Sequence, residues 1–192
     1  MEQSTDRRVR RTRAQLRRAL TTLLAEKDLS GISVKELTDL ADVNRGTFYC
    51  HYKDIFDMLE QVENELFAEF SAVMDAYSTA DLRDGLRPIL ADVFRFVRKN
   101  ADLCTALLTS RVDSAFFQRL NGVIFEKCMR EWGDLYSLRD TADGRYYLDF
   151  LVAGAVGMVR TWVAGGLKES PEDMAALAEG IIRFGVQSLR GV

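Results

Sequence analysis

The segment SVKELTDLADVNRGTFYCHYKD, residues 33–54, contains two short helical patterns joined by a turn. Ser33 and Glu36 have the spacing of a capping box, in which each residue satisfies a free backbone N–H group of the other. A helix is therefore predicted to begin at Val34, because apolar residues then recur at the spacing of one helix face. The residues expected to face inward are Val34, Leu37, Leu40 and Ala41.

A second short helix is predicted after a tight turn at Asp42 and Val43. Asn44 is a strong N-cap residue, so this helix should run from Arg45 to about His51. Two short helices in this arrangement, with a longer helix on each side, form a helix-turn-helix. Val43 and Phe48 would anchor the second helix on Leu20, Leu37 and Leu40, which leaves Arg45, Thr47, Tyr49 and His51 facing outward.

The outward residues have the chemistry that double-stranded DNA requires. Arg45 can donate two hydrogen bonds to a guanine in the major groove, and Gly46 allows a close approach of the backbone. Polar side chains around them can bind phosphate oxygens, and the N-terminus of the first helix favours a phosphate. The predicted DNA-binding residues are Arg10, Arg13, Ser33, Lys35, Asn44, Arg45, Gly46, Thr47, Tyr49, His51, Tyr52 and Lys53. For His51 the alternative is a purely structural cap on the second helix.

Charge is distributed unevenly along the chain. Residues 1–53 carry eleven Lys and Arg against seven Asp and Glu, whereas the remaining residues carry fifteen against twenty-two. Six of the residues from Arg7 to Arg17 are arginine, and none is acidic. A basic head on an acidic body suggests that only the head meets a polyanion. An ordinary solvated helix start is the alternative for these arginines.

The segment 31–54, and above all its core TFYCHYKD at residues 47–54, resembles the DNA-binding domain of the TetR family of bacterial regulators. The resemblance covers about residues 10–60 and implies a transcription regulator. The family commonly has Gly in the turn where this chain has Asp42. Asp tolerates a left-handed backbone, so we expect the turn to survive at a small cost.

Helical patterns continue to the end of the chain, and only two prolines, Pro88 and Pro171, interrupt it. Period-2 runs long enough for a sheet are missing, so the predicted fold class is all-α with about nine helices. The helix-turn-helix domain is expected at residues 1–53, and a helical ligand-binding and dimerisation domain at 54–192. The helices expected beyond Tyr77 are Asp81–Lys99, Ala101–Thr109, Ser114–Trp132, Ala142–Gly165 and one that starts at Ser170.

The segment LDFLVAGAVGMV, residues 148–159, is apolar on nearly every side. A helix of this kind must be covered on several faces, either inside its own domain or by a second subunit. The run WVAGGLKESPEDMA, residues 162–175, is similar to a TetR subset whose last two helices form the dimer interface. A homodimer is therefore expected, because two-fold symmetry also matches a palindromic operator. The expected interface residues are Leu151, Ala155, Met158, Trp162, Ile181 and Phe184.

Aromatic and methionine side chains cluster in the middle helices. Most could be plain core packing, but together they could line a cavity for a small apolar or aromatic effector. The predicted ligand-binding residues are Phe94, Met129, Trp132 and Trp162.

Other classes of function find little support in the sequence. The three cysteines are too scattered for a disulfide framework, and with a single histidine they form no metal-ligand pattern. Motifs for catalysis or cofactor binding are also missing, so neither an enzyme nor a cofactor is expected. The longest charge-free apolar run, residues 150–159, is about half of a bilayer span, so no membrane segment and a cytoplasmic location are expected. The sequence thus predicts a ligand-responsive repressor, with an activator or adaptor that works through a protein partner as the alternative.

Overall fold

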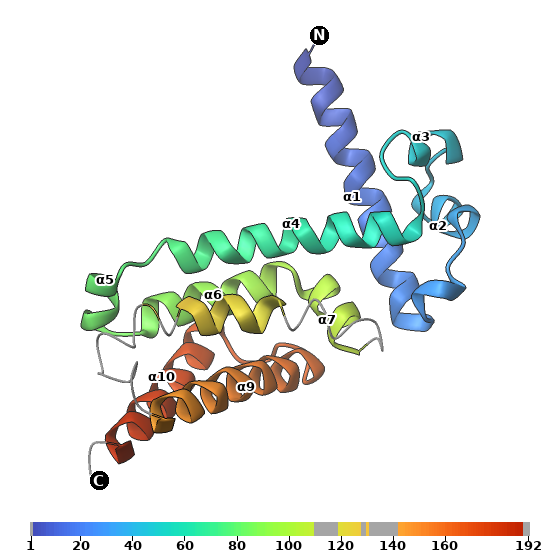
Figure 1. Cartoon of the computed structure of the whole chain (residues 1–192). Coiled ribbons are helices and arrows are strands. Elements are labelled where there is room, and N and C mark those ends of the chain that lie inside the picture. Colours follow the sequence, from blue (N-terminus) through green and yellow to red (C-terminus); the bar gives the residue numbers. More distant parts are fainter. Residues whose placement is uncertain (1, 110–118, 128–129, 131–141, 190–192) are drawn as a thin grey trace. The chain divides into compact units, whose positions relative to one another are not determined.

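The computed structural model describes residues 2–109, 119–127, 130 and 142–189. Within these ranges every regular element is a helix, which confirms the all-α fold class (Figure 1). The chain divides into two compact units, 1–66 with 102–113, and 67–101 with 114–192.

The first unit contains the N-terminal helices and the first half of α4. Its elements are α1 (Glu2–Glu26), a short 3-10 turn (Leu29–Gly31), α2 (Val34–Ala41), α3 (Arg45–Tyr49), α4 (Ile55–Asp75) as far as Leu66, and most of α7 (Ala101–Thr109). Its core consists of side chains with almost no exposed surface: Leu16, Leu20, Leu37, Phe48, Met58, Val62 and Leu103. The apolar face of α1, which includes Leu16 and Leu20, thus packs against the helix-turn-helix and belongs to the same core.

Side-chain caps mark the start of each short helix, but only the Ser33 half of the predicted capping box is formed, because the Glu36 carboxylate pairs with Lys27. The Ser33 Oγ atom accepts a hydrogen bond from the Glu36 backbone at 3.2 Å, and the Asn44 Oδ1 atom accepts one from Gly46 at 2.7 Å. Asp42, between the two helices, is left-handed with φ 52° and ψ 47°. The expected left-handed turn is confirmed.

Leu40 is a correction, because its side chain is 51% exposed rather than turned inward. The buried side chains of α2 are Leu37, Thr38 and Ala41, so the buried face of the helix is centred on Leu37 and Thr38 and leaves Leu40 outside it. Val34 is half-buried.

The second unit contains the rest of α4, α5 (Thr79–Asp84), α6 (Arg87–Lys99), a helical segment at 119–127, α9 (Ala142–Ala164) and α10 (Pro171–Leu189). The single helix expected at Asp81–Lys99 is wrong, because α5 ends before Gly85, which has a φ of 146°. Glycine adopts such a backbone conformation readily, whereas other residues are strained in it. The helix is therefore interrupted at Gly85. Helix α6 then packs along α10.

The turn between α9 and α10 is held by α6. The Phe94 and Trp162 rings meet edge to face at 5.4 Å, and the Arg98 guanidinium lies 5.3 Å from the centre of the Trp162 ring. The Trp162 Nε1–H group donates to the Glu169 carbonyl at 3.2 Å, and Arg98 donates to the Leu167 carbonyl at 2.9 Å. Phe94 and Trp162 are each only 3% exposed, so they form part of the core of this unit.

The boundary between the units lies within α4, between Leu66 and Phe67, rather than between residues 53 and 54. The physical reason is that the first turns of α4 supply core side chains to the first unit. Ile55, Met58, Leu59, Val62 and Leu66 are all buried.

Candidate nucleic-acid interface

Helix α3 is attached to the first unit through one aromatic ring. Phe48 has no exposed surface, whereas its neighbour Tyr49 is 50% exposed. The Phe48 ring contacts Tyr49 edge to face at 5.4 Å and the Tyr52 ring at 5.6 Å. Consecutive residues on this short helix therefore differ in exposure, with Phe48 in the core and Tyr49 at the surface.

Arg45 and Tyr49 form an exposed pair on the outer side of α3. The Arg45 guanidinium donates to the Tyr49 hydroxyl at 3.3 Å, and its carbon lies 5.7 Å from the centre of the Tyr49 ring. The two residues are four apart, so they are neighbours on one helix face. A guanidinium presented in this way is available to a planar acceptor pair such as guanine O6 and N7.

Gly46 has a structural role that the sequence alone did not indicate. A Cβ atom at this position would lie 3.2 Å from the Asn44 Oδ1 atom, which accepts the N-cap hydrogen bond of α3. A larger residue would therefore crowd the cap at the start of the helix. The expected close approach to DNA and this local constraint both favour glycine.

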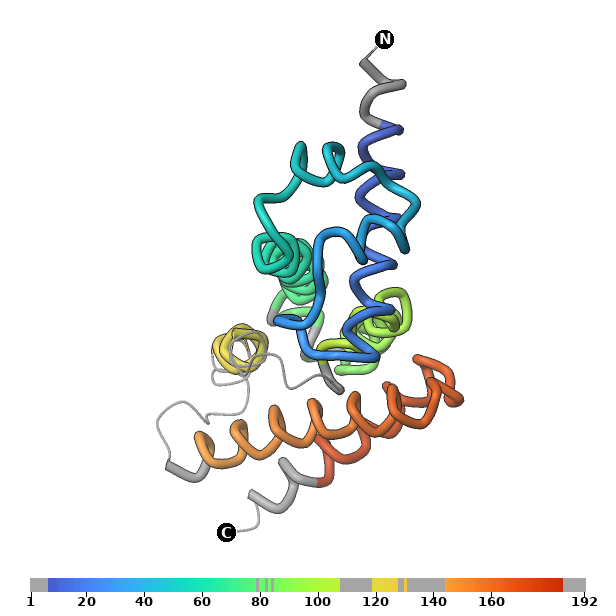
Figure 2. Tube along the Cα trace, turned by 90° about the vertical axis from the view of Figure 1, so that its right-hand side faces the viewer, coloured from blue at the N-terminus to red at the C-terminus, as the bar shows by residue number. Residues whose placement is uncertain are grey.

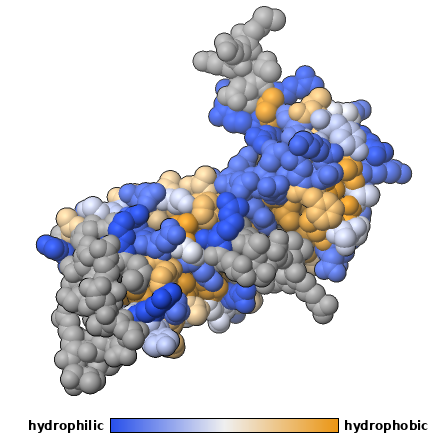
Figure 3. Space-filling model, in the orientation of Figure 1, coloured by the Kyte–Doolittle hydropathy of each residue, from blue (hydrophilic) through white to orange (hydrophobic). Residues whose placement is uncertain are grey.

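The remaining predicted contacts lie on this unit with different degrees of exposure. Arg10, Ser33, Lys35, Asn44 and Lys53 are exposed, and Thr47 and His51 are half-buried. On the face seen in Figure 3, hydrophilic side chains gather over the N-terminal helices. Contact of these residues with DNA stays a prediction.

Tyr52 and Arg13 are corrections to the predicted set. Tyr52 is only 4% exposed, and its hydroxyl accepts a hydrogen bond from the Arg13 Nε–H group at 3.3 Å. Arg13 also donates to Gln61 at 3.1 Å and pairs with Glu65 at 3.1 Å. The hydrogen bond to Tyr52 raises the pKa of the Arg13 guanidinium. These two residues join α1 to α4 and to the end of α3, so their polar groups are used within the protein.

The network around Arg13 was missed because its members are far apart in the sequence. Gln61 and Glu65 are 48 and 52 positions from Arg13, so spacing along the chain gives no signal for the contact. Their separation of four residues on α4 does place them on one helix face. This shared helix face is the one feature of the sequence from which a common partner of Gln61 and Glu65 could have been predicted.

Two of the four predicted ligand-binding residues, Phe94 and Trp162, lie within the described part of the chain and contact each other, and their role in ligand binding stays a prediction. A shallow hollow of about 500 Å³ lies between α4 and α6, and it is lined by Glu69, Ala72, Val73, Asp92, Arg95, Phe96 and Lys99. Phe94 and Trp162 are absent from this lining and are buried instead. Met129 and Trp132 lie outside the described residues.

Polar groups beside this hollow pair with one another. Asp92 accepts hydrogen bonds at 2.6 Å from the Tyr77 hydroxyl and from Arg95, and Arg95 also donates to Glu172 at 2.7 Å. The hydrogen bond from Tyr77 lowers the pKa of Asp92. Burial, together with the Asp92 carboxylate, raises the pKa of Tyr77 to about 12. These pairs join the end of α4 to α6 and α10.

Large apolar side chains are exposed along α9 and α10. Among the predicted interface residues, Ile181 is 47% and Phe184 75% exposed, and Ala155 is also exposed. Leu151 and Met158 are half-buried. Trp162 is a correction, because its ring is buried within its own unit. The sequence interpretation missed Tyr146, Phe150 and Leu177 on the same helices, which are 74%, 70% and 55% exposed.

The C-terminal half of the chain matches a known protein family. The family model "Transcriptional regulator C-terminal region", of TetR type, matches residues 84–184. This chain belongs to the TetR family of transcriptional regulators.

A curated relative is the uncharacterized HTH-type transcriptional regulator YxbF of Bacillus subtilis strain 168. The two sequences are 27% identical over an alignment of 191 positions, which covers 91% of this chain but 45% of the relative. The chain thus spans less than half the length of that relative.

Solved structures show the same fold. The fatty acid degradation regulator FadR of Bacillus halodurans gives a TM-score of 0.67 at 17% identity, with 93% of this chain and 96% of the other covered. A TetR-family regulator of Syntrophomonas wolfei gives 0.69 at 16% identity, covering 91% and 94%. NalD of Pseudomonas aeruginosa, described as the secondary repressor of the MexAB-OprM multidrug efflux pump, gives 0.66 at 17% identity, covering 96% and 98%.

Proposed function

We propose that this chain is a sequence-specific DNA-binding repressor that acts as a homodimer on a palindromic operator. The observation that carries the proposal is the orientation of α3, on which Arg45 and Tyr49 are exposed while Phe48 is fully buried. A helix held in this way can enter the major groove and place its N-terminal side chains against base edges. Ser33 and Lys35 are exposed at the start of α2, and in this proposal they bind the flanking phosphates.

The exposed apolar side chains of α9 and α10 support the homodimer. Single apolar residues on a surface are ordinary, but large side chains grouped on two contacting helices indicate a surface that is covered by another protein. Tyr146 and Phe150 lie four residues apart on α9, and Leu177, Ile181 and Phe184 recur at helical spacing on α10, so each exposed set shares one face of its helix. A two-fold dimer would hold two copies of α3 about 34–36 Å apart, one turn of the duplex.

The proposed dimer interface would also explain why α9 is so apolar. One helix of the described residues, Gly144–Ala164, is long and apolar enough to cross a membrane by length and composition, which is weak support for a membrane span. Burial of one face of α9 in a dimer accounts for that composition in a protein that acts on DNA in the cytoplasm.

We further propose that a small apolar or aromatic effector controls DNA binding. Structural neighbours include FadR of Bacillus subtilis in complex with stearoyl-CoA and a SmeT–triclosan complex. An effector of this chain must bind the DNA-competent and the DNA-incompetent arrangements with different affinity, since otherwise it shifts no equilibrium. A reporter gene behind the chain's own promoter would give the sign of regulation, with repression expected.

Fluorescence anisotropy tests DNA binding directly. The probe is a labelled duplex from the region upstream of the chain's own gene, with a scrambled duplex of equal length as competitor. We expect Arg45→Ala and Tyr49→Ala to lower the affinity for the upstream duplex, Arg45→Ala by about 1–3 kcal/mol. Arg83→Ala, an exposed arginine on α5, is the matched control and should bind as the wild type does. Absence of binding at low salt, or unchanged binding by both α3 variants, would overturn the proposal.

A further inference from the structure

Gln61 on α4 uses both ends of its side-chain amide. Its Oε1 atom accepts a hydrogen bond from the Arg13 guanidinium at 3.1 Å, and its Nε2 atom donates one to the Asp57 Oδ2 atom at 3.1 Å. A guanidinium only donates and a carboxylate only accepts, so a single orientation of the amide serves both partners. Figures 1 and 2 show the middle of α1 passing the start of α4, the two helices that these side chains connect.

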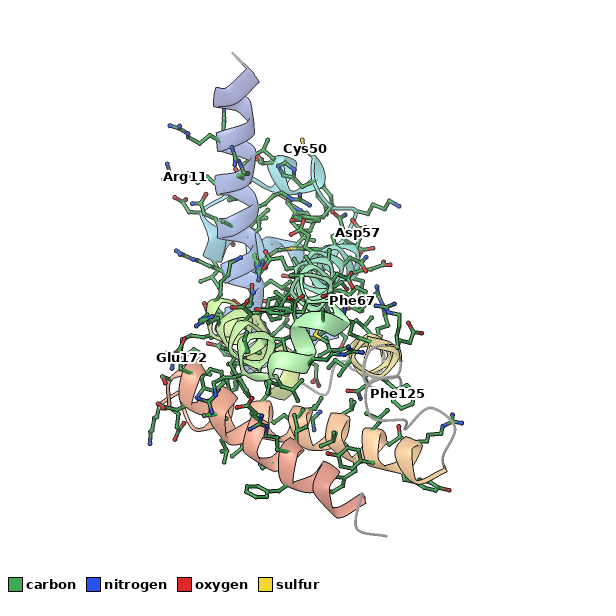
Figure 4. The ribbon with its side chains drawn as sticks, turned by 90° about the vertical axis from the view of Figure 1, so that its left-hand side faces the viewer. Arg11, Cys50, Asp57, Phe67, Phe125 and Glu172 are labelled. Atoms are coloured by element: carbon green, nitrogen blue, oxygen red, sulfur yellow. The ribbon has the colours of Figure 1, made fainter. Side chains whose placement is uncertain are left out.

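The bond from Gln61 to Asp57 leads to the loop between α3 and α4. The Oδ2 atom of Asp57 also accepts the Lys53 backbone N–H group at 2.8 Å. Lys53 comes four residues after Tyr49, at which α3 ends. Figure 4 shows Asp57 on the same side of α1 as Cys50, the residue that follows α3. The position of the Asp57 carboxylate therefore affects the backbone that leaves α3.

The bond between Gln61 and Arg13 leads to the aromatic anchor of α3. Arg13 donates to the Tyr52 hydroxyl at 3.3 Å, and its guanidinium carbon lies 5.7 Å from the centre of the Tyr52 ring. The Tyr52 ring in turn lies 5.6 Å from the ring of Phe48, which is fully buried. Gln61 is thus connected to α3 by two routes, through Arg13 to the buried rings and through Asp57 to the loop.

We infer that Gln61 is a positioning residue, which sets the orientation of α3 and thereby the specificity of base reading without touching DNA. The inference rests on the proposed DNA binding through α3. A guanidinium reads a guanine through two parallel hydrogen bonds, and such bonds weaken steeply as their angles depart from linear. A small tilt of α3 would therefore cost Arg45 its base contact. Contacts to phosphate carry no sequence information and would tolerate the same tilt.

The chemistry of this position favours an uncharged side chain with a donor and an acceptor. Gln61→Glu would keep a partner for Arg13 but would place a second carboxylate beside Asp57, where like charges repel. Gln61→Met has a side chain of similar length and lacks the amide, so it removes both hydrogen bonds. Gln61→Met is the sharper test, because it leaves the net charge and hence the general attraction to DNA unchanged.

The experiment measures the affinity for the upstream duplex and for a scrambled duplex of the same length over a range of salt concentrations. We expect Gln61→Met to weaken binding to the upstream duplex at least about 5-fold, the lower limit for the loss of one bidentate base contact. Affinity for the scrambled duplex and the slope of log K against log salt should stay as in the wild type. Gln15→Met, the same substitution at a half-buried position of α1 outside this network, is the matched control and should keep the wild-type affinity ratio.

The double variant R45A/Q61M separates positioning from a loss of stability. If Gln61 acts through the base contact of Arg45, Gln61→Met should change the ratio of the two affinities little once Arg45 is replaced, because the two effects are then not additive. A loss of folded protein would instead lower binding to both duplexes by the same factor in either background. Thermal unfolding followed by circular dichroism measures the stability of each variant.

The outcomes keep this inference apart from the proposed function. If Arg45→Ala abolishes discrimination between the duplexes but Gln61→Met keeps the wild-type ratio, the positioning role is overturned and the function stands. The role is also overturned if Gln61→Met weakens binding to both duplexes equally, or if it lowers the ratio as much in the Arg45→Ala background as in the wild type. If the wild type binds neither duplex at low salt, the proposed function fails and the positioning role fails with it.

Discussion

The outer face of α3 and the outer faces of α9 and α10 differ in what they expose. On α3 the large buried side chain is Phe48, and the exposed ones, Arg45 and Tyr49, carry hydrogen-bonding groups. On α9 and α10 the exposed side chains include Phe150 and Phe184, which carry none. The polar surface of α3 suits a charged partner, whereas the apolar surfaces of α9 and α10 suit another protein surface.

The difference indicates how each partner would be recognised. A polar, cationic face loses affinity as salt is added, because its charges exchange counterions with a polyanion. An apolar face gains affinity from removal of its area from water and depends little on salt. The proposed dimer would therefore persist at salt concentrations at which the protein leaves DNA.

The largest expected effect is on the anchoring of α3. Phe48→Ala removes a fully buried ring and leaves a cavity, so we expect the free energy of unfolding to fall by about 3–5 kcal/mol. Urea denaturation followed by circular dichroism measures the change. DNA affinity should be lost together with stability, because α3 depends on this ring for its position.

Tyr49→Ala is the matched control for Phe48→Ala. The Tyr49 side chain is 50% exposed, so its removal should change the stability by less than about 1 kcal/mol while DNA binding is still weakened. The contrast between neighbouring residues would disappear if both variants were equally destabilised. In that case α3 would not be oriented as described.

The next effect concerns the apolar surface of α9 and α10. Phe150→Asp and Phe184→Asp would each place two unpaired charges in the proposed interface, one from each subunit. Burial of an unpaired charge costs several kcal/mol, so we expect the dimer to dissociate at least about 100-fold more readily. Light scattering across a dilution series would show a monomer where the wild type is a dimer.

Phe56→Asp tests whether this effect is specific to the surface. Phe56 on α4 is also aromatic and 60% exposed, but it belongs to the first unit. An acidic residue in the first turn of a helix is favourable, so this variant should fold and remain dimeric. A dimer that survives both substitutions on α9 and α10 would move the interface elsewhere.

Features that depend on a few neighbouring residues could be predicted from the sequence. The caps at Ser33 and Asn44 and the left-handed Asp42 each involve groups within four residues of one another. Such interactions are determined by residue type and spacing, so the helix-turn-helix was predicted almost to its ends. The burial of Tyr52 was missed because its partner Arg13 is 39 residues away.

Features of the C-terminal unit depend more on how distant helices meet. Phe94 and Trp162 were associated with each other as residues of a ligand site; they do contact each other in the core, and their binding of a ligand stays a prediction. Whether a group of aromatic side chains encloses a cavity depends on how well the surrounding helices fill the space, which spacing along one chain does not determine. The break at Gly85 was missed because a helical apolar pattern continues on both sides of it.

The smallest expected effect is at Asp42, in the turn that positions α3. A non-glycine residue in a left-handed conformation pays a steric cost that glycine avoids, and Asp and Asn pay less than other residues do. We therefore expect the stability to rank Asp42→Gly above the wild type and Asp42→Ala below it, with each step no larger than about 1 kcal/mol. Thermal unfolding of the three proteins side by side measures the order.

Asp42→Asn separates backbone strain from charge at this position. Asn tolerates the same conformation but removes the negative charge beside the proposed DNA contact, so its stability should match that of the wild type while its affinity for any duplex increases slightly. Asp42→Gly also removes the charge and should show the same gain in affinity. If Asp42→Ala were as stable as Asp42→Gly, the φ of 52° would impose no strain on this turn. The orientation of α3 would then depend on Phe48 and the caps alone.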